Sequence, residues 1–282
     1  MILGVGVALG GGCGRVGFEQ RDAAVPRDAA EPRDAGEPRD AGEPRDAGEP
    51  RDGGEPPNLC ASLPQLGALP VLDGALEPGL VVVPIVPEGW TSSEPLPAGI
   101  AARAAIAWVP SGLYFFVEVD DPDRHPGEAP VDSYCGDAVE LFVDDDGALS
   151  APPAYDRPGT MQLIVAAPAS EGARSTYAQR FAETRIGSWP AERFVMAPRP
   201  GGYALETLIE ASELDRDEWT LASAARVGVS IAIDVSTPDG TGGEAMCPGR
   251  LGQYFLRVID GGDEGCGLPF CDARALCTPT LE

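Results

Sequence analysis

The clearest pattern of hydrophobic and polar positions lies between residues 134 and 146. Val139, Leu141 and Val143 alternate with the positions between them, one of which is Glu140. A period of two residues over this length predicts a β-strand with one face in a core. Glu140 then lies on the face opposite to Val139 and Leu141. Because a carboxylate in the middle of a strand needs water or a partner, this position is a candidate for ligand binding.

Short apolar segments recur along the chain from residue 80, with turn residues between them. The sequence has 36 Gly and 29 Pro, which favours many turns and short strands over long helices. Pro110-Ser-Gly112 is expected to form a hairpin turn, and Ala211–Leu214 a single helical turn. We therefore predict an all-β fold over residues 58–282, an antiparallel β-sandwich or jelly roll. The expected strands are Leu80–Val86, Arg103–Val109, Leu113–Val119, Asp137–Val143, Met161–Ala166, Tyr203–Ile209, Val227–Val235 and Tyr254–Val258.

Two segments precede this domain. Residues 1–13 are apolar and end in Gly11, Gly12 and Cys13, a pattern typical of a secretion signal followed by a lipid-modified cysteine. Hexads of the type Arg-Asp-Ala-Gly-Glu-Pro then fill residues 21–56. Because they have almost no apolar residues, we expect residues 14–57 to be a disordered linker. These features predict an exported protein at the outer surface of the cell envelope, with a lipid anchor on Cys13. The alternative is an N-terminus whose thiol has no role.

The charge of the chain excludes some partners and favours others. The formal net charge is −25, and the 33 acids and 13 Arg beyond residue 56 contribute −20 of it. Such a field repels phosphate backbones and anionic headgroups, so we expect no nucleic-acid partner and membrane contact through the lipid alone. A cation is favoured, and Asp120, Asp121 and Asp123 after a predicted strand are candidate calcium ligands. A solvated acidic turn is the alternative for them, and residues 144–146 are interpreted as a turn.

The cysteines indicate an oxidising compartment. Six of them lie in the predicted domain, and an even number suits three disulfides. One begins the domain and three lie near its end, so we expect Cys60 to pair with one of Cys266, Cys271 and Cys277. A zinc site made by the last three is the alternative, although their spacing fits zinc sites poorly.

An ordered set of motifs resembles a known family. Leu72–Glu77, Leu113–Pro122, Gly136–Asp144, Gly202–Ile209 and Val227–Asp234 follow one another as in the family 9 carbohydrate-binding modules and their DOMON-like relatives. The resemblance covers about residues 70 to 260. It implies an immunoglobulin-like or jelly-roll β-sandwich that binds sugar at one concave site, often with structural calcium. It also implies a domain without catalysis that frequently accompanies glycoside hydrolases.

The resemblance assigns roles to particular residues. Tyr134 stands where the family has an aromatic residue that stacks on the sugar, and Glu140 matches a residue that hydrogen-bonds sugar hydroxyls. The alternatives to sugar binding are structural: Tyr134 could cover the end of a strand, and Glu140 could be solvated or paired with an Arg. Cys247 lies where a second aromatic is expected, and we predict a Cys135–Cys247 disulfide at the rim. Apolar residues replace other polar positions of the family's site, namely Ile164, Ala166 and Ala232.

These observations predict a surface-tethered, non-catalytic, monomeric domain that binds polysaccharide or oligosaccharide, with calcium as a candidate ion, and that could assist glycoside hydrolases. An enzyme is not expected, because the single histidine, His125, has no Ser or Cys constellation around it. One alternative is a haem-binding relative of the same sandwich, with His125 and one of Met161, Met196 and Met246 as axial ligands. Another is an envelope scaffold whose ligand site has decayed.

Overall fold

The computed structural model describes most of one compact unit, Gly54–Glu282. The described residues are 58–87, 89–126, 133–148, 159–169, 178–181, 187–214, 216, 221–237, 247, 249–259, 268–270 and 272–282. The predicted signal segment, the lipid anchor at Cys13 and the repeat linker lie outside them.

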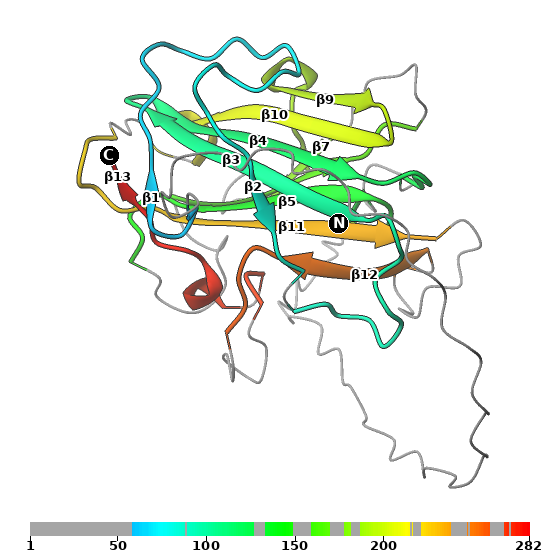
Figure 1. Ribbon diagram of the computed structural model, residues 1–282. Helices are drawn as coiled ribbons and strands as arrows, with labels where there is room; N and C mark the ends of the chain where they lie inside the picture. The colour runs from blue at the N-terminus through cyan, green and yellow to red at the C-terminus, as the bar shows by residue number, and fades with distance from the viewer. Residues whose placement is uncertain are drawn as a thin grey trace, which may run out of the picture. The chain divides into compact units, whose positions relative to one another are not determined.

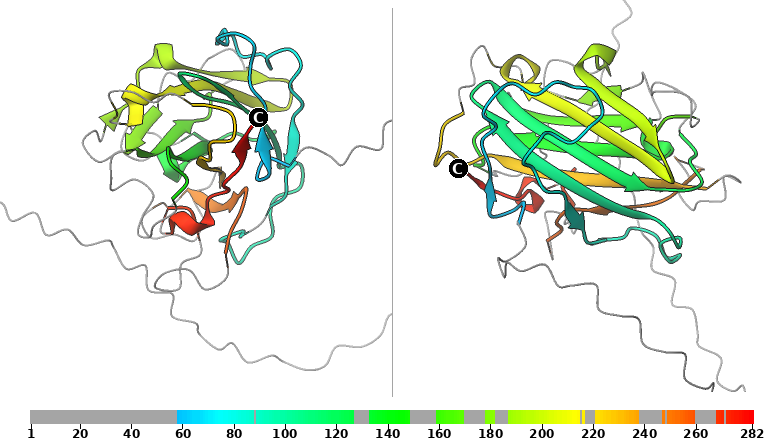
Figure 2. Two further views of the ribbon diagram at one scale, coloured as in Figure 1. Left: turned by 90° about the vertical axis from the view of Figure 1, so that its left-hand side faces the viewer. Right: turned by 45° about the horizontal axis from the view of Figure 1, so that its top comes forward.

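Two antiparallel sheets form the domain, which confirms the predicted all-β sandwich (Figures 1 and 2). The five-stranded sheet has the order β2 (Val83–Ile85), β3 (Ala101–Val109), β4 (Gly112–Asp120), β10 (Gly202–Glu210), β9 (Phe194–Arg199). The six-stranded sheet has the order β12 (Arg250–Phe255), β11 (Gly228–Ser236), β5 (Ala138–Asp144), β6 (Thr160–Ala166), β7 (Ala178–Phe181), β8 (Gly187–Ser188). Short 3-10 helices complete the described elements: η1 (Ser133–Cys135), η2 (Ala191–Arg193), η3 (Ala211–Leu214) and η5 (Ala273–Ala275).

The core lies between the two sheets and follows the alternation of the strands. Val139, Leu141 and Val143 of β5 point into it, as do Phe115 and Val117 of β4. Each strand therefore presents its alternate residues to the outer face of its sheet. This arrangement directs Glu140 away from the core, as its position in the pattern predicts. The outer faces are covered in part by loops and by the C-terminal segment.

The hairpin between β3 and β4 has the predicted turn. Val109 pairs with Gly112 across it, which leaves Pro110 and Ser111 to reverse the chain. A side chain at Gly112 would collide with the backbone of Ile209 in β10, so glycine is required by the close approach of these strands. β3, β4 and β10 thus form the continuous centre of the five-stranded sheet.

The segment before β2 packs on the outer face of the five-stranded sheet. Glu206 of β10 is buried there and accepts hydrogen bonds from the backbone N–H groups of Asp73 (2.8 Å) and Gly74 (2.7 Å) and from the hydroxyl of Tyr114 (2.9 Å). These three donors compensate the carboxylate for its burial. Apolar side chains of the segment, such as Leu72, cover the sheet around this anchor.

The two ends of the domain are joined. Cys60 forms a disulfide with Cys277, one of the three predicted partners, and this bond leaves Cys277 unable to contribute a thiolate to zinc. The strands β1 (Ser62–Leu63) and β13 (Thr280–Leu281) pair in parallel beside it (Figure 1). The other candidate partners, Cys266 and Cys271, lie outside the described residues. Among the helices that the structure describes, none has the length and apolar character needed to span a bilayer.

Several strands differ from the prediction: β2 is shorter than expected, and β1, β7, β8, β9 and β13 were not predicted. β12 begins at Arg250, four residues before the predicted start at Tyr254, and the stretch 256–258 is not part of it. β9 was not predicted, because Pro198 and the Arg residues that flank its sequence obscure the alternation. Pro198 is tolerated because β9 is an edge strand with one neighbour, β10. The earlier start of β12 bears directly on the candidate site.

Candidate functional site

Glu140 lies at the centre of a polar row on the outer face of the six-stranded sheet. Ala232 of β11 and Ile164 of β6 flank it in register. Despite its outward direction, Glu140 is only 2% exposed. Burial of an acid on this face requires partners from neighbouring strands, and the structure supplies them.

Two glutamine side chains satisfy the Glu140 carboxylate. Gln162 of β6 donates from Nε2 to Oε2 (2.9 Å), and Gln253 of β12 donates from Nε2 to Oε1 (3.1 Å). The same Gln253 nitrogen also donates to Oδ1 of Asp234 on β11. The row therefore crosses four strands, with a second buried acid beside the predicted one.

The two acids influence each other's titration. Burial raises the pKa of Glu140, and burial together with the charge of Glu140 raises the pKa of Asp234 well above its ordinary value. Arg250 acts in the opposite direction on both groups. Burial thus disfavours the ionised forms of both groups, and the charge of Glu140 adds to this effect at Asp234. Oδ2 of Asp234 is buried and has no hydrogen-bond partner.

Arg250 connects Tyr134 to the acid pair. Its guanidinium carbon lies 5.8 Å from the centroid of the Tyr134 ring, and its Nη1 donates to the backbone oxygen of Tyr134 (3.3 Å). The same Nη1 lies 3.6 Å from Oδ1 of Asp234. The side chain of Arg250 is 12% exposed. The structure thus places both predicted sugar-binding residues, Tyr134 and Glu140, around one guanidinium.

A disulfide holds the rim of this site together. Cys135 follows Tyr134 in η1 and is bonded to Cys247, the pairing that the family resemblance predicts. The backbone oxygen of Cys247 accepts a hydrogen bond from the backbone N–H of Arg250 (3.0 Å). The bond therefore joins the segment that carries Tyr134 to the segment that carries Arg250, although 112 residues separate the two cysteines.

The three calcium candidates have different surroundings. Asp120 pairs with Arg199, and Asp121 is buried and accepts a hydrogen bond from the backbone N–H of Asp123 (3.0 Å). The Asp123 side chain is 75% exposed and lies beside His125 (3.1 Å). Asp120, Asp121 and Asp123 do not form a group whose oxygens all lie within 4.8 Å of one another. Calcium binding by this protein stays a prediction.

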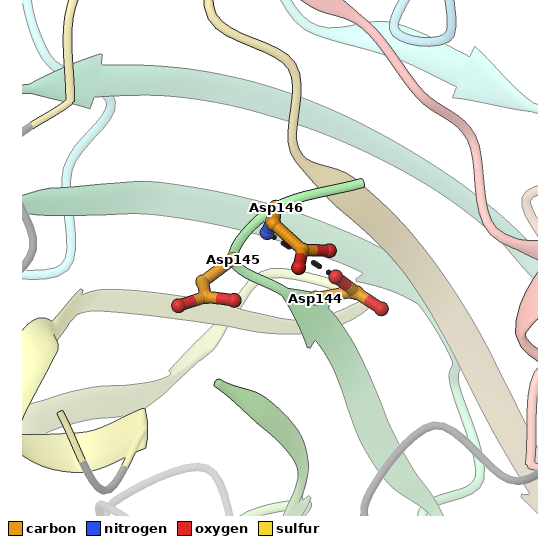
Figure 3. Close-up of side chains that lie close together, drawn as sticks. All are labelled: Asp144, Asp145 and Asp146. Atoms are coloured by element: carbon orange, nitrogen blue, oxygen red, sulfur yellow. Dashed lines mark hydrogen bonds between the residues drawn. The ribbon is translucent and has the colours of Figure 1, made fainter. Parts of the chain in front are cut away.

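Asp144, Asp145 and Asp146 are the one group of three acids, among the described residues, whose oxygens lie within 4.8 Å of one another (Figure 3). Oδ1 of Asp144 accepts hydrogen bonds from the backbone N–H groups of Asp146 (3.2 Å) and Gly147 (3.1 Å). Asp145 pairs with Arg216 (2.7 Å). Hydrogen bonds of this kind stabilise a turn at the end of a strand, which agrees with the interpretation from the sequence.

The haem alternative finds little support in the arrangement of its candidate ligands. Met161 and Met196 are fully buried in the core between the sheets, where a haem would have to displace the packing. His125 lies outside that cluster, and its backbone N–H and C=O both bond to Asp137. Met246 lies outside the described residues. These residues do not fit an axial pair for haem.

Sequence reasoning missed Gln162, Asp234, Arg250 and Gln253. The apolar residues Ile164 and Ala232 do lie beside Glu140, as predicted. The polar partners Gln162 and Asp234 lie two residues away along the same two strands, on the same face of the sheet. Gln162 and Asp234 share the two-residue phase of that face and could have been found from it. Arg250 and Gln253 precede the predicted start of their strand, so no signal pointed to them.

Comparisons with known proteins agree with this architecture. No family model matches the sequence, and no curated protein matches it. A family 9 carbohydrate-binding module from Caldicellulosiruptor kristjanssonii, solved in complex with cellotriose, is 14% identical, with a TM-score of 0.54; the match covers 79% of this chain and 93% of that one. A structure of such a module from the same organism with glucose is 15% identical, with the same TM-score, and covers 78% and 95%. The chain therefore shares the fold of family 9 carbohydrate-binding modules.

Proposed function

We propose that residues 58–282 form a non-catalytic domain that binds oligosaccharides or polysaccharides at the outer face of the six-stranded sheet. The observation that carries the proposal is the polar row around Glu140 with Tyr134 at its rim, in a fold shared with modules solved with cellotriose and glucose. The tyrosine ring offers an apolar face to the C–H groups of a sugar. The amide and carboxyl groups of the row are buried, and they would supply donors and acceptors to its hydroxyls once the Arg250 side chain moves aside.

The setting of the domain supports a role outside the cell. The domain contains two disulfide bonds, and disulfide bonds persist in oxidising compartments. We infer that the domain is held at the cell surface by a lipid on Cys13, with residues 14–57 as the linker. It would act as a monomer, without nucleic-acid or direct bilayer contact, beside enzymes that hydrolyse glycans. Calcium remains a candidate stabilising ion.

Calorimetric titration of the full chain with soluble oligosaccharides, with and without calcium, tests the proposal. We expect at least one saccharide to bind, and Tyr134→Ala to weaken its binding by about tenfold or more through loss of the stacking face. Val71→Ser is the matched control, because Val71 is exposed in the segment that covers the other sheet. A panel without any binding, or an affinity that Tyr134→Ala leaves unchanged, would contradict the proposal.

A further inference from the structure

The space between the Tyr134 ring and the buried acids contains a cation that belongs to the chain itself. The Arg250 guanidinium lies over the ring and beside Asp234, and only a small part of its side chain meets solvent. A sugar that stacks on Tyr134 and reaches Glu140 has to enter this space. Arg250 must then move, or the sugar remains outside the polar row.

Displacing Arg250 has an electrostatic cost that depends on the ligand. The guanidinium offsets the negative charge of the Glu140–Asp234 pair, and a neutral ligand in its place leaves that charge buried without compensation. A ligand with its own cation restores the balance. It also regains the attraction between a cation and the face of an aromatic ring.

The shape of the acceptor set favours an ammonium group. Oδ2 of Asp234 is buried without a hydrogen-bond partner, and Glu140 lies across the shared amide of Gln253. An ammonium group has three donors on a single small centre, so it can serve both acids at once. The charge of −20 carried by residues beyond 56 attracts such ligands over longer distances as well.

We propose that this site selects sugars that carry a protonated amine, the 2-amino sugars, with the ammonium group taking the place of Arg250 beside Asp234. The inference rests on the proposed sugar-binding function and names its ligand class. Acetylation of the amine removes the charge and adds bulk, so N-acetylated sugars lose the advantage. Unsubstituted neutral sugars bind with the cost of the uncompensated acids.

Three β-1,4-linked trisaccharides that differ only at carbon 2 provide the test. Calorimetry of the full chain, at a pH where the sugar amine is protonated and the acid pair keeps a negative charge, compares the glucosamine trimer with cellotriose and with the N-acetylglucosamine trimer. We expect the glucosamine trimer to bind about tenfold more tightly than either of the others. Its advantage should shrink as salt is added, because part of the attraction acts through solvent.

Asp234→Asn is the informative variant, since it removes the charge and keeps the shape. The ratio between the affinities for the glucosamine trimer and cellotriose should fall to near one. If that variant does not fold, the comparison of the three ligands with the unchanged protein decides by itself. Equal affinities for all three would overturn this inference and leave the proposed function intact. Absence of binding by every saccharide would overturn the proposed function, and the inference with it.

Discussion

Glu140 and Asp234 lie on adjacent strands of one sheet and share the side-chain amide of Gln253. Both are buried, and one arginine, Arg250, compensates them. The alternation of β5 predicted one acid on this face, Glu140, and the structure adds a second, Asp234, from β11. This relationship makes the site a structural element as well as a candidate ligand site, so its variants affect both stability and binding.

Removal of Glu140 should destabilise the domain. Glu140→Ala leaves the Gln162 amide buried without its acceptor and removes one of the two acceptors of the Gln253 amide, so we expect the free energy of unfolding to fall by about 2–4 kcal/mol. Urea unfolding followed by tryptophan fluorescence measures it. Glu118→Ala is the control, because Glu118 pairs with Arg103 nearer the surface and should cost less than about 1 kcal/mol. Equal losses for the two variants would show that the polar row is not satisfied as described.

The stability of the domain should fall as pH rises from the acid range to about 8. Burial and the nearby charge of Asp121 raise the pKa of Asp137 to about 8, although backbone N–H groups of His125 and Ser236 favour its ionised form. Because the folded state holds this proton more tightly than the unfolded chain, the stabilisation is complete below the ordinary pKa of an aspartate and is lost as the pH rises through about 8.

Unfolding midpoints measured across this range test the assignment. Asp137→Asn should reduce the slope of stability against pH, whatever its effect on stability at a single pH. The slope should not vanish, because other buried acids, among them Glu206, also have a raised pKa. A slope identical to that of the unchanged protein would refute the role of Asp137.

Only one of the two disulfides should affect saccharide binding. Cys135→Ser with Cys247→Ser releases the segment that carries Tyr134, so saccharide affinity should drop by about tenfold while the sandwich stays folded. Cys60→Ser with Cys277→Ser removes the other bond and should leave affinity unchanged, although each pair of substitutions should lower stability by roughly 4–5 kcal/mol because both bonds close long loops. The reverse pattern would contradict the account of the rim.

Arg250 should act as a competitor of the ligand. With Arg250→Ala the internal cation is gone, and the glucosamine trimer should bind about three- to tenfold more tightly because no exchange precedes it. Arg103→Ala, on the other sheet, should leave that affinity unchanged. Weaker binding in Arg250→Ala would instead identify the guanidinium as a direct donor to the sugar.

Much of the fold was accessible from the sequence because it depends on local alternation. β5, β6 and β10 lie within one residue of their predicted bounds, and η3 forms at the predicted helical turn. The direction of Glu140 follows from the same pattern. Its burial does not, because it depends on Gln253, 113 residues away in the chain, which meets Glu140 only through the order of strands in the sheet.

The site as a whole illustrates this limit. Tyr134, Glu140 and the Cys135–Cys247 pair followed from the resemblance to a family, whereas Arg250 did not, because glycines on both sides hid the start of β12. The register between β11 and β12 also shifts between Val235 and Ser236, and Ser236 is the residue that lies opposite Arg250 in the sheet. A register shift of this kind cannot be deduced from the alternation of one strand.

The central claim is that saccharides bind at the polar row beside Tyr134. Nuclear magnetic resonance of the full chain, titrated with a binding trisaccharide, tests it most directly. The account predicts that the largest shifts arise at Tyr134, Glu140, Asp234 and the Arg250 side chain. Shifts confined to the five-stranded sheet, around Glu206 and the segment that covers it, would contradict the claim.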